Sequence, residues 1–157
     1  MQKSWVWGLV NMSSSRYEKV QRVRITCLIV HGNEILLMRR IIEDEGLDIW
    51  EFPSGTPEFG EDPEKTAERE AREETSLELE KKGLFATGSC TYFLHGKHYH
   101  EIVIAFLFEA KDKDVKLSFE HVDAKWVKPE ELFKIPNLAL TIRAIMPRIK
   151  EYYGVRS

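Results

Sequence analysis

Residues 55–77 read GTPEFGEDPEKTAEREAREETSL and carry the strongest structural signals in this 157-residue sequence. Asp62 can act as a helix N-cap, and Pro63 suits the first helical position because the N–H that it lacks would have no partner there. The run Glu64–Thr75 consists mostly of residues with high helix propensity. The segment therefore predicts a loop followed by a helix over about Pro63–Thr75.

Negative charge is concentrated on this predicted helix and its flanks. Ten acidic and three basic residues lie between Glu58 and Glu80, a local net charge of −7 in a chain whose formal net charge is −3. Glu70 precedes Glu73 and Glu74 by three and four residues, so all three share one helix face. Like charges at these spacings cost a helix about 0.2–0.5 kcal/mol per pair. A hard cation such as Mg²⁺, which prefers oxygen ligands, would relieve that repulsion; a solvated acidic face is the alternative.

The order of polar residues around the helix resembles the Nudix box. In that motif a Gly, a Glu, an Arg-Glu-aliphatic triplet, a Glu-Glu pair and a Gly-aliphatic pair stand at fixed spacings. The matching positions here are Gly55, Glu61, Arg69-Glu70-Ala71, Glu73-Glu74 and Ser76-Leu77. Ser76 is the one departure from the family's Gly, and it should cost some stability at a left-handed helix end without removing a ligand. Upstream, Trp50-Glu51-Phe52-Pro53 also resembles the strand and loop that lead into the box.

This resemblance to the Nudix (MutT-like) hydrolase family implies roles for the box residues. Glu70, Glu73 and Glu74 would be the ligands of Mg²⁺, which Mn²⁺ could replace, and Glu73 would also count among the catalytic residues. A backbone carbonyl around Ser54–Gly55 would add a further oxygen. Arg69 would orient a box glutamate through an ion pair, with an ordinary helix salt bridge as the alternative.

The resemblance also implies candidates beyond the three ligands. Glu61 would be a structural partner or an outer metal ligand, and Gly55 would allow the backbone to approach metal or phosphate closely. The family often uses one more carboxylate from a later loop, as general base or extra ligand. Glu120 fits that place, with a plain loop glutamate as the alternative, and Glu101 on a strand is a weaker rival.

Besides Gly55, three residues are candidates for contacts with the substrate. Arg39 and Arg40 alternate on a predicted strand, so only one can face a phosphate, and we take Arg39 as the candidate. Trp50 could stack on a base in a cleft. Tyr92 lies sixteen residues past Ser76, and in some family members a Tyr near this distance is associated with dinucleoside polyphosphates.

A zinc site is the competing interpretation for the histidines of a predicted hairpin. His98 and His100 would share one face of a strand, and His95 lies just before them. No cysteine is close enough in sequence to complete an ordinary zinc pattern. We therefore expect partly exposed histidines at a hairpin tip, one of which could instead touch the substrate.

The rest of the chain is expected to complete one α+β domain. The family resemblance implies a Nudix-type α/β/α sandwich around a mixed β-sheet, formed by residues 21–157 behind an N-terminal extension of residues 1–20. Strands are predicted over residues 23–30, 35–39, 48–52, 84–94, 99–109 and 124–127. Apolar residues spaced by four, three and four from Leu138 to Ile149 indicate a C-terminal helix, which Pro147 should kink or interrupt.

Together these features predict a Mg²⁺-dependent pyrophosphohydrolase. It would cut a phosphoanhydride bond in a nucleoside diphosphate linked to another group, such as an ordinary or oxidised nucleoside triphosphate. Dinucleoside polyphosphates, ADP-ribose or a nucleotide sugar are alternative substrates, and a non-catalytic module that senses a nucleotide is an alternative of another class. Three intact ligands argue against the sensor, because binding alone does not require them.

Composition limits the other partners and the location. The net charge of −3 provides no basic field for a nucleic acid polymer, and apolar runs are too short to span a membrane. Two cysteines far apart in sequence suit a reducing compartment. We expect a cytoplasmic protein that binds a nucleotide substrate and could form a homodimer.

Overall fold

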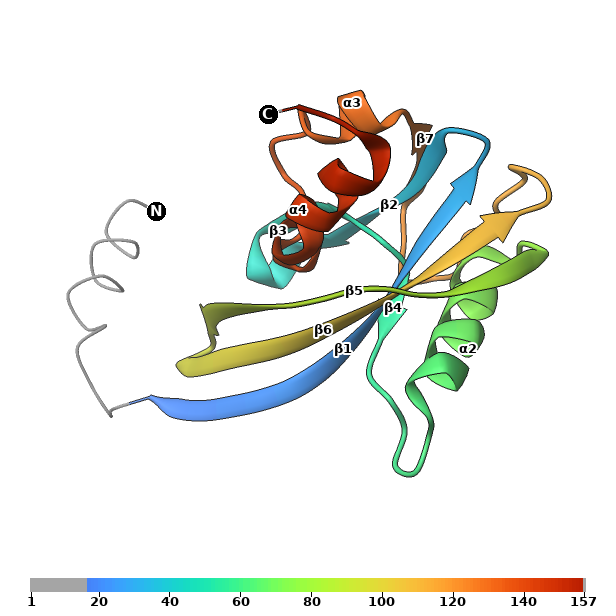
Figure 1. Cartoon of the computed structure of the whole chain (residues 1–157). Coiled ribbons are helices and arrows are strands. Elements are labelled where there is room, and N and C mark those ends of the chain that lie inside the picture. The colour runs from blue at the N-terminus through green and yellow to red at the C-terminus, as the bar shows by residue number, and fades with distance from the viewer. Residues whose placement is uncertain (1–16, 157) are drawn as a thin grey trace.

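A mixed β-sheet forms the centre of the computed structural model, which describes residues 17–156 (Figure 1). Its strands are β1 (Glu18–His31), β2 (Glu34–Ile42), β3 (Leu47–Glu51), β4 (Ser54–Gly55), β5 (Leu79–Leu94), β6 (Lys97–Ala110) and β7 (Asp123–Val127). The main order is β3-β2-β1-β6-β5, with β4 paired to β1 and β7 paired to β2. β1 and β6 run parallel, and the other pairs are antiparallel.

Helices cover both faces of this sheet. They are α2 (Pro63–Thr75), the short α3 (Pro129–Leu132) and α4 (Leu140–Tyr153), with a 3₁₀ turn η1 at Glu43–Glu45. Alternation along β2 sends Leu36 into the core under α2, together with Ala67 and Ala71 of that helix. It sends Leu37 into the opposite core, where Ile142 of α4 is buried. The structure therefore has the expected α+β architecture, with a mixed sheet flanked by helices.

The box segment forms the predicted loop and helix. Asp62 caps α2 by accepting a hydrogen bond from the Glu64 N–H at 2.9 Å. Ser76 ends the helix in a left-handed conformation, with φ of 57°, and its N–H donates to the Arg72 carbonyl. The position that departs from the motif thus keeps the backbone geometry for which a Gly is favoured.

Two strands are longer than the sequence predicted. β1 starts at Glu18 rather than residue 23, because its polar first half pairs continuously with β6 from the Glu18–Lys97 register onward. β5 starts at Leu79 rather than residue 84, and the next three residues, Glu80, Lys81 and Lys82, are charged and face solvent at the edge of the sheet. Neither segment has the apolar alternation by which a strand is recognised. Most of the proposed N-terminal extension lies outside the described residues.

Pro147 was expected to kink or interrupt the C-terminal helix, and the structure shows no interruption there. α4 runs from Leu140 to Tyr153 through Pro147. Ile142 and Ile149, which lie on either side of the proline, are fully buried in the core. This tertiary packing holds both halves in one helix despite the missing backbone hydrogen bond. Within residues 17–156, no helix has the length and apolar character needed to cross a membrane.

Candidate active site

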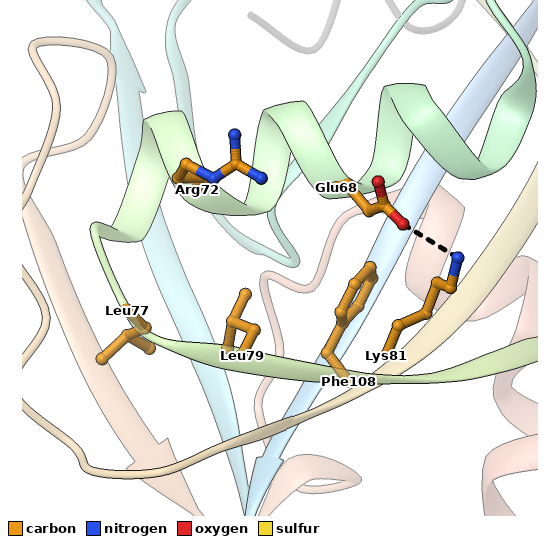
Figure 2. A pocket seen from close by; sticks show the side chains of 6 residues that line it. All are labelled: Glu68, Arg72, Leu77, Leu79, Lys81 and Phe108. Atoms are coloured by element: carbon orange, nitrogen blue, oxygen red, sulfur yellow. Dashed lines mark hydrogen bonds and ion pairs between the residues drawn. The ribbon is translucent and has the colours of Figure 1, made fainter.

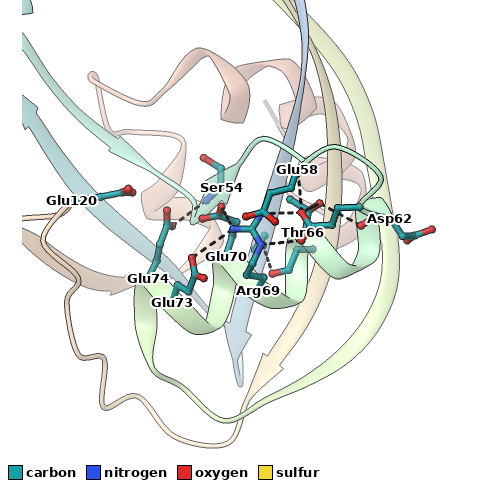
Figure 3. Close-up of polar contacts among 12 residues, drawn as sticks. Ser54, Glu58, Asp62, Thr66, Arg69, Glu70, Glu73, Glu74 and Glu120 are labelled. Carbon is teal, nitrogen blue, oxygen red and sulfur yellow. Dashed lines mark hydrogen bonds and ion pairs between the residues drawn. The ribbon is translucent and has the colours of Figure 1, made fainter.

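The loop before α2 brings backbone groups against the glutamates of the helix. β4 pairs with β1 through Ser54 and Gly55, which fixes both residues beside α2. The Ser54 N–H donates a hydrogen bond to Oε2 of Glu74 at 3.1 Å. A Cβ atom on Gly55 would overlap the side chain of Glu70, so the absence of a side chain at Gly55 is what lets Glu70 reach the strand. Figure 3 shows Ser54, Glu70 and Glu74 gathered beside this loop.

Arg69 joins the start of the box to the glutamates of α2. Its guanidinium donates to both carboxylate oxygens of Glu61 at 2.9 and 2.8 Å, and to Glu70 at 2.7 Å. It also lies 3.6 Å from Glu73. The bonds from Arg69, with a further bond from the Thr66 hydroxyl, lower the pKa of Glu61 to about 2. Glu61 therefore stays ionised and holds the guanidinium in place beside the other two carboxylates.

Glu74 is buried without sufficient compensation for a charge. It is 2% exposed, and its Oε1 has no hydrogen-bond partner within residues 17–156. Burial raises its pKa to about 9, helped by the negative charges of Glu70, Glu51 and Glu120. Burial also raises the pKa of Glu70, although Arg69 opposes that shift. Buried anionic groups in such a state need a positive partner, and a divalent cation with oxygen ligands meets that need.

The third predicted ligand, Glu73, lies on the solvent side of the same helix. Its side chain is 60% exposed and forms an ion pair with Arg69 at 3.6 Å. Figure 3 shows Glu73 next to Glu74 near the C-terminal end of α2, with Glu120 pointing toward them from a different part of the chain. The three box glutamates thus span a range from buried to exposed, which suits a site open to substrate on one side.

The loop before β7 adds a carboxylate and an imidazole to the site. One oxygen of Glu120, one ring nitrogen of His121 and one oxygen of Glu74 all lie within 4.8 Å of one another. Glu120 is 41% exposed on its side chain, whereas the His121 side chain is fully buried. The later-loop glutamate singled out from the sequence therefore lies beside a box glutamate. The adjacent histidine was not identified from the sequence.

Glu51 and Arg40 form an ion pair next to His121. Glu51, at the end of β3, accepts a hydrogen bond from Nε of Arg40 at 2.7 Å and lies 2.9 Å from Nε2 of His121. Arg40 also comes within 3.6 Å of Glu120. In the sequence, Arg40 stood out only as part of the Arg39–Arg40 pair, and Glu51 only as part of the strand that leads into the box. Neither signal distinguishes a site residue from an ordinary strand residue.

Gly55 lies against Glu70, whereas Arg39 and Trp50, two other predicted substrate-binding residues, make other contacts. Arg39 forms a two-point ion pair with Asp48, at 2.9 and 2.8 Å. It is opposite Trp50 in the β2–β3 register, and Trp50 packs against the core under α4 with Lys125 above its ring. On β2 it is Arg40, one residue further on, that reaches the carboxylates. Arg39 and Trp50 stay candidates for contacts on the α4 side of the sheet.

Tyr92 and Glu101 belong to a polar cluster on the long strands β1, β5 and β6. Glu101 is buried and accepts hydrogen bonds from Nε of Arg22 at 2.7 Å and from the Tyr92 hydroxyl at 3.0 Å. Arg24 lies 3.3 Å from the same oxygen. Burial and the charge of Glu101 raise the pKa of Tyr92 to about 12. Glu101 is thus engaged with two arginines, while Tyr92 stacks on Tyr99.

The three hairpin histidines contact different neighbours rather than one another. His95 lies at the tip and contacts Glu45, His98 stacks on Phe93, and His100 contacts Gln21. Within residues 17–156, no three-residue group of metal-ligating side chains includes any of them. They are hairpin residues, as the sequence suggested.

A cavity of about 160 Å³ lies on the other side of α2, away from the carboxylates (Figure 2). Its lining includes Leu79, Phe108 and Arg72, together with Lys81 and Glu68, which form an ion pair of 2.8 Å. None of the predicted ligands lines this cavity.

Comparison with known proteins agrees with this arrangement. A model of the NUDIX domain matches residues 20–149. The chain is 28% identical over 143 residues to dihydroneopterin triphosphate diphosphatase of Haemophilus influenzae, covering 82% of this chain and 88% of that protein. It superposes on the MutT protein of Methanosarcina mazei Go1 with a TM-score of 0.68 and 27% identity, covering 87% of this chain and 97% of the other.

A more distant structure shares the fold alone. It is the binary complex of a C. elegans Ap4A hydrolase, with a TM-score of 0.61 and 22% identity over 85% of this chain and 96% of the other. The box spacing, the sheet between helices and the domain match over residues 20–149 all agree. The chain belongs to the Nudix family and is a hydrolase that acts on phosphoanhydride bonds.

Proposed function

We propose that the enzyme is a Mg²⁺-dependent pyrophosphohydrolase of nucleoside triphosphates, ordinary or oxidised, which releases the nucleoside monophosphate and pyrophosphate. The observation that carries the proposal is the unpartnered Oε1 of Glu74, buried where Glu70, Glu120 and His121 converge. A site with this excess of negative charge can attract a polyphosphate only through bound cations.

The donor set fits a divalent cation. Glu70, Glu73 and Glu74 would hold it, together with a backbone oxygen near Gly55, where the chain approaches Glu70 without an intervening side chain. Mn²⁺ could replace Mg²⁺ because both accept carboxylate oxygens. When bound, the cation would neutralise phosphate charge and lower the pKa of water.

The side chains around the ligands have separate tasks. Arg69 is a positioning residue, since its three ion pairs hold Glu70 and Glu73 in a fixed relation to Glu61. Glu120 is proposed as the general base, because its half-exposed carboxylate can reach both solvent and the site. Arg39, Trp50 and Tyr92 are proposed to contact the part of the substrate beyond the reacting phosphates.

Dihydroneopterin triphosphate is a second candidate substrate. It also carries a triphosphate on a heterocyclic compound, and the relative from Haemophilus influenzae, which acts on it, aligns with most of this chain. Dinucleoside polyphosphates remain the alternative suggested by Tyr92, whose hydroxyl is bound to Glu101 and Arg22 in this structure.

The test is a comparison of substrates with the purified full chain. Ordinary and oxidised nucleoside triphosphates, dihydroneopterin triphosphate, diadenosine tetraphosphate, ADP-ribose and a nucleotide sugar would be compared at equal concentration with Mg²⁺. The proposal expects the highest kcat/KM on a triphosphate, with pyrophosphate as a product. A higher kcat/KM on ADP-ribose, a nucleotide sugar or the tetraphosphate would contradict the substrate assignment.

A further inference from the structure

We propose that His121 is a metal ligand, and that with Glu74 it forms a mixed nitrogen–oxygen subsite for a transition-metal cation such as Mn²⁺. The proposal rests on the proposed function and adds to it a donor atom from outside the Nudix box. Glu120 lies on the solvent side of the same subsite. The choice of metal ion would then depend on a ligand from the loop before β7 as well as on the ligands from α2.

Two neighbouring side chains of the site, Glu74 and His121, each carry a buried atom without a partner. Oε1 of Glu74 and Nδ1 of His121 are both shielded from solvent and have no hydrogen-bond partner within residues 17–156. Both residues belong to the group whose ligand atoms lie within 4.8 Å of one another. A buried polar atom left unpaired destabilises the fold, because it has lost its hydrogen bonds to water. One cation bound between the two side chains would satisfy both atoms together.

The contacts behind His121 select the nitrogen that can bind a cation. Nε2 lies 2.9 Å from a carboxylate oxygen of Glu51, which accepts hydrogen bonds only, so the proton of a neutral imidazole belongs on Nε2. The lone pair then lies on Nδ1, the nitrogen that has no partner. A carboxylate that accepts the other ring N–H is the usual support of a metal-bound histidine.

Arg40 keeps Glu51 in that supporting role. Its guanidinium donates to the Glu51 carboxylate at 2.7 Å, which balances the buried negative charge. The same side chain comes within 3.6 Å of Glu120. One oxygen of Glu51, Oε1, thus contacts both Arg40 and His121 and orients the imidazole. Glu74 keeps one oxygen on the Ser54 N–H and leaves the other for the cation.

A nitrogen donor changes which cation the site favours. Sites built only of carboxylates and carbonyls suit Mg²⁺, whereas affinity for nitrogen-containing sites rises along the first-row transition metals. Mn²⁺ should therefore bind at this subsite more tightly than Mg²⁺ does. Removal of the imidazole should bring the affinities for Mn²⁺ and Mg²⁺ closer together, because the nitrogen donor is the ligand that favours Mn²⁺.

The direct test is pulsed electron paramagnetic resonance of the full-length wild-type protein with less than one equivalent of Mn²⁺. The expected result is ¹⁴N modulation from a directly bound nitrogen, which changes to a ¹⁵N pattern when the protein carries ¹⁵N-labelled histidine. His121→Gln should abolish the modulation and weaken Mn²⁺ binding about 10- to 100-fold, by analogy with changes to residues that support metal ligands. Mg²⁺ binding should weaken less.

Two further variants separate a ligand role from a structural one. His95→Gln changes an exposed hairpin histidine and should keep the modulation and the Mn²⁺ affinity of wild type. Glu51→Gln retains an oxygen acceptor for the imidazole, so it should keep the modulation while weakening Mn²⁺ binding. Mn²⁺ bound without ¹⁴N modulation in wild type, or modulation that persists in His121→Gln, would overturn the proposal and leave the proposed function intact. Failure of the wild-type protein to bind any divalent cation would overturn both.

Discussion

Gly55 has no side chain at the point where the Glu70 carboxylate lies, and a Cβ atom there would overlap Cγ, Cδ and Oε1 of Glu70. The first Gly of the box and the first glutamate of the ligand set are therefore one packing unit. The φ of Gly55 is not in the left-handed region, so the requirement for Gly is one of space rather than of backbone conformation.

Gly55→Ala should destabilise the fold by roughly 1–3 kcal/mol, the usual cost of forcing an extra group into a packed place. It should also weaken cation binding, because Glu70 must move. Glu70→Ala removes the three atoms nearest to the new methyl group, so Gly55→Ala should cost much less in that background. Chemical denaturation of the two single variants and the double variant measures this coupling. Additive free energies would show that the close approach has no energetic consequence.

Glu73→Gln should lower turnover by a factor on the order of a hundred or more, by analogy with losing one preorganised electrostatic contact. An amide is a poorer ligand for a hard cation than a carboxylate. The fold should be unaffected, because Glu73 is 60% exposed, and the loss of repulsion with Glu70 could raise the metal-free Tm slightly. Steady-state kinetics and melting curves test both points, with Glu78→Gln on the exposed surface as the matched control. Turnover near the wild-type value would remove Glu73 from the ligand set.

Glu74 should make the metal-free protein less stable as the pH rises. Its pKa in the fold is raised to about 9 from an ordinary value of 4.5, so the folded state holds the proton more tightly than the unfolded chain does. The resulting stabilisation is fully present below pH 4.5 and is lost as the pH rises through about 9. Saturating Mg²⁺ should restore the Tm at high pH, because it binds only the folded, ionised site.

Glu74→Gln provides the check, since it removes the titrating group and retains the shape. The Tm of the metal-free protein would be measured from about pH 5 to about pH 9. It should fall less with rising pH in the variant than in wild type. The variant should also lose most of the stabilisation by Mg²⁺. If both proteins show the same fall, burial of Glu74 does not control the pH dependence.

Glu120→Gln should separate the general base from the ligands. A base variant loses turnover and retains its cation affinity, whereas a ligand variant loses both. We expect reduced kcat with nearly unchanged Mn²⁺ affinity, because the carboxylate is 41% exposed and lies on the open side of the site. Calorimetric titration beside kinetics measures both quantities. If Glu120→Gln has the kcat of wild type, Glu120 is not the general base but an ordinary loop residue.

The parts of this enzyme that sequence could predict are those fixed by local rules. Asp62 and Pro63 mark the start of α2 through capping and proline geometry, and the helix begins at Pro63. The spacing of Glu70, Glu73 and Glu74 fixes their shared face, since the period of a helix is constant. These rules need only neighbours along the chain, and the resemblance to the Nudix family rested on the same residues.

What the sequence could not provide depends on contacts between distant segments. Glu51 meets His121 across seventy positions of sequence, and the β1–β6 register alone brings the polar residues after Glu18 into the sheet. Arg40, rather than Arg39, reaches the carboxylates because Arg39 is held by Asp48 on β3. Alternation along a strand shows that two neighbours face opposite ways, but the site lies on a side that only the fold reveals.

The central claim is cation-dependent attack of water at phosphorus in this glutamate site. Its most direct test is hydrolysis of the best triphosphate substrate in ¹⁸O-labelled water, with mass spectrometry of the products, for wild type and Glu73→Gln. The account predicts one labelled oxygen in either the monophosphate or the pyrophosphate product, dependence on Mg²⁺ that chelation abolishes, and at least a hundredfold slower labelling in the variant, by the analogy used for its turnover. Labelling that continues without any divalent cation, or that is as fast in Glu73→Gln as in wild type, would contradict it.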